Sequence, residues 1–315
     1  SLLIPLVEQF GTLLLLRILQ GALLAGLPAT AIAYMGEEFS KRALLSAVGV
    51  YIAANSLGGI AGRVVGGLLA GWFGDWQHTF LGIGVISLSL LPLVFWLLPH
   101  QTRFVASAPV RGQFARALQQ HLTNPLLIGA YLIGGLNFMV FLNQFSYLTF
   151  LLAKPPFSLP TQWLGMLFLT YLSGTVASSL SGRFANRWGA QRMLLVGIAL
   201  MAIGSLWLLQ GSLLGILSGL LVSSFGFFLA HACASAWVGH HVEHNRALAS
   251  SLYLVAYYLG ASLGGLYLHP FWERGELGGL VMGIELVLIL TAGLSLWLGR
   301  LKQRSQSPLP AQQPH

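Results

Sequence analysis

The sequence predicts an all-α protein, a bundle of helices that crosses a membrane many times. The 315-residue chain is 56% apolar and only 8% charged, whereas a soluble protein carries about a quarter charged residues. Its apolar residues gather in runs long enough to span a bilayer, which takes roughly 20 residues of helix. The strands of a membrane barrel are shorter and alternate in polarity, so the spans are predicted to be helical.

Nine predicted spans follow one another along the chain, and residues 1–7 resemble the end of a further span. The nine are 11–36, 43–71, 80–99, 125–153, 163–183, 193–209, 212–238, 247–271 and 277–299. The single cysteine, Cys233, falls inside a span, so we expect no disulfide bond.

The net charge of +8 indicates the orientation of the spans rather than a nucleic-acid partner. If span 11–36 runs from outside to inside, twelve of the sixteen Lys and Arg residues fall on the inner side, whereas only Lys154 and Arg274 fall outside. Cytoplasmic loops carry such an excess, so the carboxyl terminus is predicted to be cytoplasmic. The inner residues are Lys41, Arg42, Arg103, Arg111, Arg116, Arg183, Arg187, Arg192, Arg246, Arg300, Lys302 and Arg304.

An internal repeat suggests how the chain is organised. Segment 41–59, KRALLSAVGVYIAANSLGG, aligns with segment 245–265, NRALASSLYLVAYYLGASLGG, with two extra residues in the second copy. A duplicated unit is the favoured interpretation, and chance similarity between two glycine-rich helices is the alternative. The first copy is preceded by about three spans fewer than the second, so we expect a truncated six-plus-six protein.

This organisation predicts four regions. They are an incomplete first half (1–99), a central cytoplasmic loop (100–124), a second half of six helices (125–300) and a polar, Pro-rich tail predicted to be disordered (301–315).

Three short motifs lie in order along the predicted spans and loops. LLLLRILQG occupies residues 13–21, a glycine-rich pattern follows on the next span, and SGRFANRWGAQR forms a predicted cytoplasmic loop at 181–192. The residues that carry these motifs are Arg17, Gln20, Gly21, Gly58, Gly62, Arg63, Gly66, Gly67, Gly182, Arg183, Arg187, Gly189 and Arg192.

Together the motifs resemble the major facilitator superfamily of secondary transporters, and within it the bacterial drug- and arabinose-efflux permeases. The resemblance covers all but the tail and implies a pseudo-twofold six-plus-six fold, of which these spans are helices 4 to 12. It also implies a monomer in the bacterial inner membrane. The chain departs from the family patterns at Arg63, where antiporters usually have proline, and at Asn186, where the loop usually has aspartate.

Two arginines inside spans are candidates for coupling or substrate contact. Arg63 lies twelve residues before Asp75, about 18 Å below the predicted outer boundary, where a bare guanidinium costs at least a few kcal/mol. It shares a helix row with Asn55, and the alternative is an arginine satisfied by carbonyl groups or snorkelling. The resemblance implies a role in proton coupling for Arg17, and the alternative is an anchor at the outer interface.

The resemblance implies that the spans 11–36, 125–153 and 212–238 line a central cavity. On span 125–153, Asn137, Phe141 and Gln144 share one face, and amides beside an aromatic ring suit a mixed polar and apolar ligand. The alternative is that these amides bond across helices. His231 lies deep in a later span and could titrate near neutral pH, although a structurally satisfied histidine is the alternative.

Glu285 is the only carboxylate well inside a span, which makes it a functional candidate by default. The resemblance places it on a peripheral helix, so pairing or gating remains as open as proton carriage. We expect the histidines of HHVEHN (240–245) to lie in a solvated loop without a metal.

Small residues predict two helix seams. The row Gly58, Gly62 and Gly66 is predicted to pack against a row Gly174, Ser178 and Gly182 across the two halves, either as a sliding seam or as ordinary tight packing. A third row, Gly260 and Gly264, is predicted to lie open to lipid, because its partner would belong to the missing helices.

The function favoured by these residues is secondary transport, as proton-coupled efflux of a small organic solute by alternating access. The alternatives are an importer of a sugar or organic anion, or a truncated chain without activity. No ATP-binding signature is present, and the scattered acids do not favour a membrane enzyme. The expected partners are lipid, a small-molecule substrate and protons, with no cofactor, metal or nucleic acid.

Overall fold

A computed structural model describes residues 1–98, 112–242 and 245–306, and throughout this part of the chain every regular element is a helix. The chain forms two compact units. The first comprises residues 1–109 and 159–169, and the second comprises residues 110–158 and 170–315.

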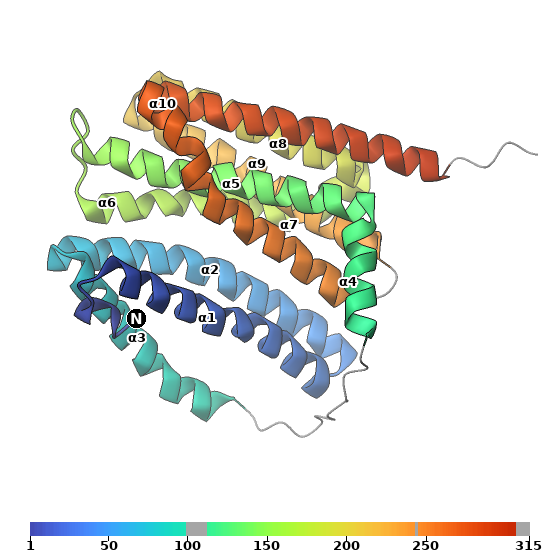
Figure 1. Ribbon diagram of the computed structural model, residues 1–315, viewed down its shortest axis with the longest axis horizontal. Coiled ribbons are helices and arrows are strands. Elements are labelled where there is room, and N and C mark those ends of the chain that lie inside the picture. Colours follow the sequence, from blue (N-terminus) through green and yellow to red (C-terminus); the bar gives the residue numbers. More distant parts are fainter. Residues whose placement is uncertain (99–111, 243–244, 307–315) are drawn as a thin grey trace, which may run out of the picture. The chain divides into compact units, whose positions relative to one another are not determined.

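The first unit is built from three long helices, labelled in Figure 1. They are α1 (Phe10–Glu38), α2 (Lys41–Phe73) and α3 (Trp76–Leu97), preceded by the short η1 (Ile4–Leu6). The connection before α3 is specified locally, because Gly74 adopts a φ of 77° and the Asp75 carboxylate accepts a hydrogen bond from the His78 amide at 2.6 Å. The unit also contains α6 (Thr161–Met166) and most of η2 (Leu167–Thr170).

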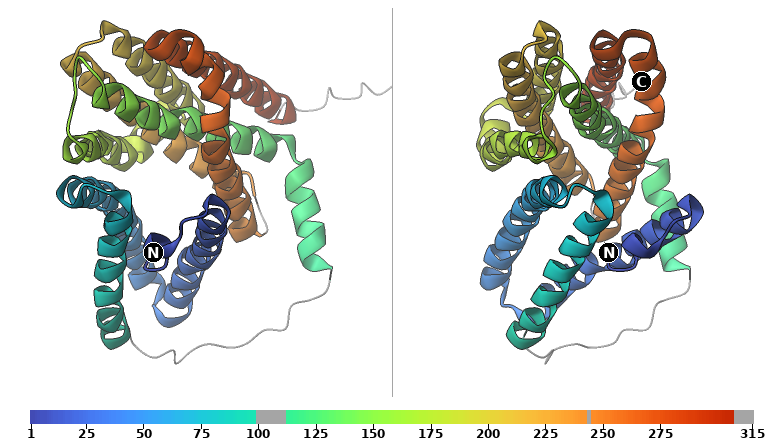
Figure 2. Two further views of the ribbon diagram at one scale, coloured as in Figure 1. Left: turned by 60° about the vertical axis from the view of Figure 1, so that its left-hand side comes forward. Right: turned by 90° about the vertical axis from the view of Figure 1, so that its left-hand side faces the viewer.

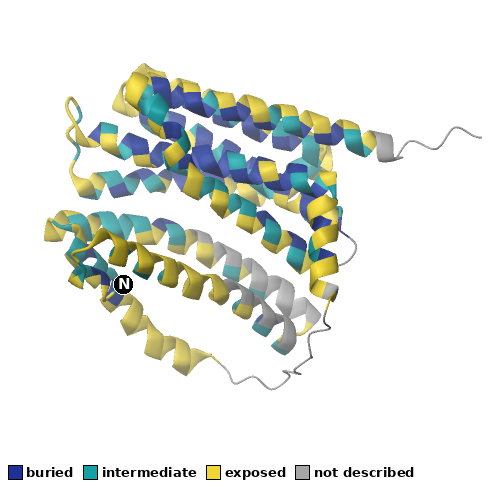
Figure 3. Cartoon of the chain, viewed as in Figure 1, coloured by how far each residue is buried: buried dark blue, intermediate teal, exposed yellow. Residues whose placement is uncertain are grey.

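The second unit is a bundle of more deeply buried helices. These are α4 (Gln113–Thr123), α5 (Pro125–Ala153), α7 (Tyr171–Trp188), α8 (Ala190–Trp207), η3 (Leu208–Gln210), α9 (Leu213–His240) and α10 (Arg246–Gln306). Buried residues follow α5, α9 and α10 in Figure 3.

The element α10 is two spans in one. Its backbone leaves the helical conformation at Gly275 and at Glu276, which has a φ of 42°. Figure 2 shows the chain turning back on itself within α10, so that a first arm (246–274) and a second arm (277–306) lie in the same bundle. These arms correspond to the two predicted spans 247–271 and 277–299.

The predicted fold class is confirmed. Every predicted span falls on a helix or on consecutive helices, and seven described helices are long and apolar enough to cross a membrane, with α10 counted as one. Within the described ranges, the end of α2 (Leu57–Phe73) is a shorter apolar helix.

The boundaries of the predicted regions need correction. Part of the expected central loop is helical, because α4 occupies Gln113–Thr123, and the first six residues of the expected tail continue α10 to Gln306. Residues 159–169 pack with the first unit, although the sequence groups them with the second half. Arg103, Arg111, His244 and residues 307–315 lie outside the described residues, as do the side chains of Lys41, Arg42 and Arg304.

The prediction that Gly260 and Gly264 lie open to lipid is wrong. Both glycines face α5, and a methyl group added at Gly260 would collide with the carbonyl of Gly135, while one added at Gly264 would collide with Asn143. The Asn143 amide donates a hydrogen bond of 2.8 Å to the carbonyl oxygen of Ala261. The row therefore finds a partner within its own unit, because small residues let two helix backbones approach closely.

Candidate functional site

The predicted cavity residues of α5 lie inside the second unit. Asn124 accepts a hydrogen bond from the Leu126 amide and Pro125 occupies the first helical position, so the start of α5 is specified by its own sequence. Asn137, Phe141 and Gln144 are only 3%, 1% and 1% exposed. Their spacing places them on one face of the helix, as predicted.

Gln144 bonds across to another helix. Its Nε2 donates to the hydroxyl oxygen of Ser223 on α9 at 3.0 Å, and both side chains are buried. The observed contact of Gln144 is therefore of the kind given as the alternative above, a hydrogen bond between two helices.

Phe141 lies at the centre of an aromatic cluster. Its ring stacks on Phe227 of α9 with centroids 3.9 Å apart and an angle of 5°, and Phe145 meets it edge-on at 5.4 Å. Phe138 stacks on Tyr257 of the first arm of α10 at 3.7 Å. We define the aromatic cluster as Phe138, Phe141, Phe145, Tyr171, Phe227, Phe228 and Tyr257.

Asn137 differs from Gln144 in having an uncommitted oxygen. Its Oδ1 is buried and has no hydrogen-bond partner among the described residues. A buried polar atom without a partner costs about 1–3 kcal/mol. Asn137 directly precedes Phe138 of the aromatic cluster, and a group that donates a hydrogen bond would satisfy this oxygen.

His231 joins the same cluster. Its Nδ1 lies 2.9 Å from the hydroxyl oxygen of Tyr253, and its ring lies 4.8 Å from that of Tyr257 and 5.9 Å from that of Phe227. Which of the two groups donates depends on the tautomer of the imidazole. The fold therefore gathers candidates from α5 and α9 around shared aromatic rings.

Glu285 lies apart from the aromatic cluster, on the second arm of α10. Its Oε1 is hydrogen-bonded to the hydroxyl of Ser205 on α8. The prediction that this carboxylate pairs with another residue describes the observed contact.

Arg17 lies on α1 in the first unit. Its Nη1 donates to Gln20 Oε1 at 2.7 Å, and Gln20 Nε2 donates in turn to the Ser1 hydroxyl at 2.9 Å. The guanidinium carbon lies 5.4 Å from the centre of the Phe80 ring on α3. Arg17 and Gln20 of the first motif are thus directly linked, whereas a methyl group at Gly21 would meet nothing within 4 Å in the described part of its unit.

Arg63 is half-buried on α2 and contacts both a carbonyl group and an aromatic ring of its own unit. Its Nη1 donates to the carbonyl oxygen of Gly59 at 3.0 Å, and its guanidinium carbon lies 4.8 Å from the centre of the Phe168 ring. A cation over an aromatic face gains about 0.5–2 kcal/mol. Asn55, on the same helix row, is exposed.

The close approach of α2 runs along a different row from the predicted one. A methyl group at Gly67 would lie 2.8 Å from the Cα of Gly165 in α6, whereas added methyl groups at Gly58 and Gly62 would meet nothing within 4 Å in the described part of their unit, and Gly66 meets only a side chain at 3.8 Å. Within the first unit the close contact of α2 therefore lies on the row of Gly67, which neighbours the predicted Gly58–Gly62–Gly66 row, and the seam between the two halves stays a prediction.

In the second unit, Gly174 packs against Phe228, and a methyl group added at Gly182 would meet nothing within 4 Å in the described part of that unit. A one-residue change of row is enough to redirect a helix face by 100°, which residue spacing alone does not resolve.

The third motif forms the turn between α7 and α8. Gly189 has a φ of 90°, a left-handed conformation that favours glycine and allows α8 to begin at once. The guanidinium carbon of Arg187 lies 5.1 Å from the centre of the Trp188 ring, and Arg183 and Arg192 are exposed.

His241, the residue directly after α9, has structural contacts. His241 Nδ1 lies 2.8 Å from the carbonyl oxygen of Trp237, and the two rings stack at 4.2 Å. Burial lowers the pKa of His241, and the neighbouring Lys302 and His240 act in the same direction, while the hydrogen bond to Trp237 opposes them.

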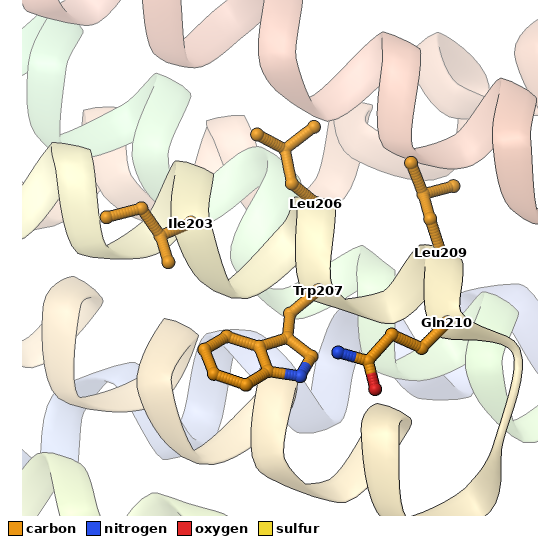
Figure 4. Close-up of a pocket in the computed structure, with 5 residues that line it drawn as sticks. All are labelled: Ile203, Leu206, Trp207, Leu209 and Gln210. Carbon is orange, nitrogen blue, oxygen red and sulfur yellow. The ribbon is translucent and has the colours of Figure 1, made fainter.

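A shallow depression at the end of α8 contains none of the predicted residues. It is lined by Ile203, Leu206, Trp207, Leu209 and Gln210, shown in Figure 4. Leu206 and Trp207 are 50% and 42% exposed, as expected of side chains that face lipid.

Sequence reasoning missed the partners of the predicted residues. Ser223 and Phe227 lie four residues apart on α9 and present one face to α5, a spacing that was visible in the sequence. Tyr253 and Ser205 carried no comparable signal, because a lone hydroxyl in an apolar run does not indicate its partner.

Comparisons with known proteins agree on one family. The profile described as Major Facilitator Superfamily matches residues 1–265. The MFS-type transporter YybF of Bacillus subtilis (strain 168) is 37% identical over 292 residues, which is 93% of this chain and 72% of that protein. The inner membrane transport protein YnfM of Escherichia coli (strain K12) is 31% identical over 291 residues, or 92% of this chain and 69% of that protein.

A more distant relative and a solved structure extend this picture. The bicyclomycin resistance protein homolog of Haemophilus influenzae is 23% identical over 260 residues, or 80% of this chain and 61% of that protein. A bacterial homolog of the human lysosomal transporter Spinster, in an inward-facing and occupied conformation, matches with a TM-score of 0.71 over 98% of this chain and 81% of that chain. At 16% identity this last likeness shows the fold alone.

Proposed function

Because this chain belongs to the Major Facilitator Superfamily, a family of multi-pass membrane transporters, we propose that it exports a small organic solute in exchange for protons. The solute crosses by alternating access, in which the site opens to one side of the membrane at a time. The protein acts in the bacterial inner membrane as a monomer, with its carboxyl terminus in the cytoplasm.

The observation that carries this proposal is the buried amide of Asn137. Its Oδ1 lacks a hydrogen-bond partner among the described residues, although the side chain is only 3% exposed. An unpaired buried polar atom is costly, so its retention is explained by a partner that is bound only part of the time. A transported solute is such a partner.

The aromatic cluster supports an organic solute of mixed character. Binding sites for small molecules are mostly apolar and aromatic, with a few polar groups that fix the orientation of the ligand. Here the stacked pair Phe141 and Phe227 supplies flat apolar surface, and Asn137 supplies a hydrogen-bond acceptor. A solute with a planar or apolar part and a donor group fits this chemistry.

Three observations favour efflux with protons. One relative is named a bicyclomycin resistance protein homolog, which is a statement about that protein and suggests an exported drug as a probe here. The glycine pattern around Arg63 resembles that of antiporters in the family. His231, bonded to Tyr253 beside the aromatic cluster, is a group that can exchange a proton.

Everted membrane vesicles from cells that express the full chain provide a direct test. Respiration acidifies the vesicle interior, and a trapped-dye signal reports the proton gradient. We expect added bicyclomycin, with arabinose as a second probe, to release protons from wild-type vesicles and to have no effect on vesicles carrying Asn137→Ala. Proton release that requires the compound to be loaded inside the vesicles would instead indicate import by symport.

The same vesicles test the two intramembrane arginines. We expect Arg17→Ala to abolish proton release, because the substitution removes the hydrogen bond between Arg17 and Gln20, two residues of the first motif. Arg63→Ala removes a cation that is bonded to Gly59 and stacked on Phe168, and we expect slower release. If both variants released protons at the wild-type rate, neither arginine would have a role in proton-coupled transport.

A further inference from the structure

Glu285 lies deep in the membrane on the second arm of α10. It follows Glu276 by nine residues and precedes Gly299 by fourteen, which corresponds to about 13 Å and 21 Å of helix. An ionised carboxylate at this depth costs several kcal/mol unless a cation or several donors surround it.

The Ser205 hydroxyl is shared between two acceptors. Ser205 is fully buried on α8, and its Oγ lies 3.0 Å from the carbonyl oxygen of Ala202 while it also contacts Oε1 of Glu285. A serine hydroxyl has one hydrogen to donate and two lone pairs with which to accept. It cannot donate to the Ala202 carbonyl and to a carboxylate at the same time.

The two contacts are compatible only when Glu285 carries a proton. A neutral carboxyl donates its O–H to Ser205 Oγ, and the hydroxyl of Ser205 then donates its own hydrogen to Ala202 O. If Glu285 were ionised, either the carboxylate or the Ala202 carbonyl would lose its only hydroxyl donor. In the low dielectric of a bilayer such a lost bond is not replaced by water.

The surroundings of Glu285 contain no compensating cation. Lys, Arg and His are absent from three described segments, which are residues 193–207 of α8, η3 and residues 277–299 of the second arm. On the first arm of α10, the Tyr267 hydroxyl donates to the carbonyl oxygen of Gly283 at 3.1 Å. On α9, His231 is bonded to Tyr253.

We propose that Glu285 is a proton-binding site of this protein, separate from the aromatic cluster, and that it holds its proton at neutral pH. When the proton leaves, the hydrogen of Ser205 turns from the Ala202 carbonyl to the carboxylate. The protonation state of Glu285 on α10 thereby determines whether Ser205 donates its hydrogen bond to the backbone carbonyl of Ala202 on α8. This inference depends on neither the substrate nor the direction of transport.

Infrared spectroscopy of the full chain in dodecyl maltoside tests the proposal. This detergent has no carboxyl or ester group, so the carbonyl stretch of a protonated carboxyl can be observed directly. The other seven acids lie outside the apolar spans predicted from the sequence, in the kind of surroundings where a carboxyl group is normally ionised at neutral pH. We therefore expect one protonated-carboxyl band in the wild type and its loss in Glu285→Gln.

Two variants serve as controls. Glu276→Gln removes an exposed acid of the same element and should leave the band unchanged. Ser205→Ala should keep the band but shift its frequency, because the carboxyl loses its hydroxyl partner. Since Glu285→Gln imitates the neutral acid, it should unfold at the wild-type temperature.

The outcomes that overturn the proposal are equally direct. They are the absence of a protonated-carboxyl band in the wild type at neutral pH, a band that survives Glu285→Gln, and a band that disappears in Glu276→Gln. A folded Ser205→Ala protein with an unshifted band would show that Ser205 is not the partner of the protonated carboxyl.

Discussion

The two units bury their helices very differently, although their spans are about equally apolar. The window Phe10–Leu27 of α1 has a mean hydropathy of 1.7 and none of it is buried, whereas the span Pro125–Ala153 of α5 has a mean hydropathy of 1.9 and 67% of its window is buried. Figure 3 shows this contrast as exposed residues along α1 and buried residues along α5. Hydropathy thus marks a membrane helix without indicating whether protein or lipid covers it.

Glycine usage differs between the units in the same way. In the second unit, α8 and α9 approach through reciprocal pairs, because a methyl group at Gly197 would lie 2.6 Å from Gly226 O and one at Gly204 would lie 2.6 Å from Gly219 O. In the first unit, Gly58 and Gly62 of α2 have open space around them within their unit. Glycine on a membrane helix is therefore not by itself a sign of close packing.

The largest expected effect comes from filling one of these glycine contacts. Gly204→Leu places a side chain against the backbone of α9 and should destabilise the protein by about 3 kcal/mol or prevent folding. Gly62→Leu in α2 should unfold at nearly the wild-type temperature. Thermal unfolding in detergent measures both variants, and equal losses would contradict the contrast between the units.

The polar residues of α5 sharpen the comparison within the second unit. Gln144→Leu removes the bond to Ser223 and should cost about 1 kcal/mol. Asn137→Leu removes an amide oxygen that has no partner among the described residues, so its unfolding temperature should be unchanged or higher.

Transport separates these two variants further. The Asn137→Leu protein should be stable and inactive in the vesicle assay, because the acceptor for the solute is lost. A clear destabilisation by Asn137→Leu would mean that the amide has a structural role, and the proposed contact with the solute would be wrong.

The corrected helix row of the first unit can be tested with adjacent residues. Gly67→Ala brings a methyl group against Gly165 and should destabilise the pairing of α2 with α6 by about 1 kcal/mol. Gly66→Ala makes an ordinary contact at 3.8 Å with a side chain and should have little effect. A larger loss of stability in Gly66→Ala than in Gly67→Ala would instead support the predicted row through Gly66.

The smallest effect concerns the turn before α3. The hydrogen bond from the His78 amide, together with the His78 side chain, lowers the pKa of Asp75 below its ordinary value of 3.8. Because the folded-state pKa is the lower one, the stabilisation is present above about pH 4 and is lost as the pH falls through the folded-state value. Asp75→Asn should remove this acid dependence from the unfolding temperature, and an unchanged acid dependence would contradict the assignment.

Several features of the candidate site could be predicted from sequence. The family and the transporter class are confirmed, and the face shared by Asn137, Phe141 and Gln144 follows from helix geometry. The partners were not predictable, because Ser223 lies 79 residues from Gln144 and Ser205 lies 80 residues from Glu285. No local pattern relates residues at such separations.

The glycine rows show the same limit. The sequence correctly marked α2 as rich in small residues, but it selected Gly66 instead of Gly67, and it left Gly260 without a partner although α5 provides one. Each row is defined by spacing, and several rows on one helix share that spacing.

The sequence by itself determined that this chain is a helical membrane transporter, because the length and polarity of each span follow from the thickness and dryness of the bilayer. Only the tertiary structure decided which polar groups are committed to a partner, as Gln144 Nε2 is, and which have none among the described residues, as is the case for Asn137 Oδ1. The physical reason is that lipid tails are as apolar as leucine, so residue composition carries almost no information about which face of a span meets protein.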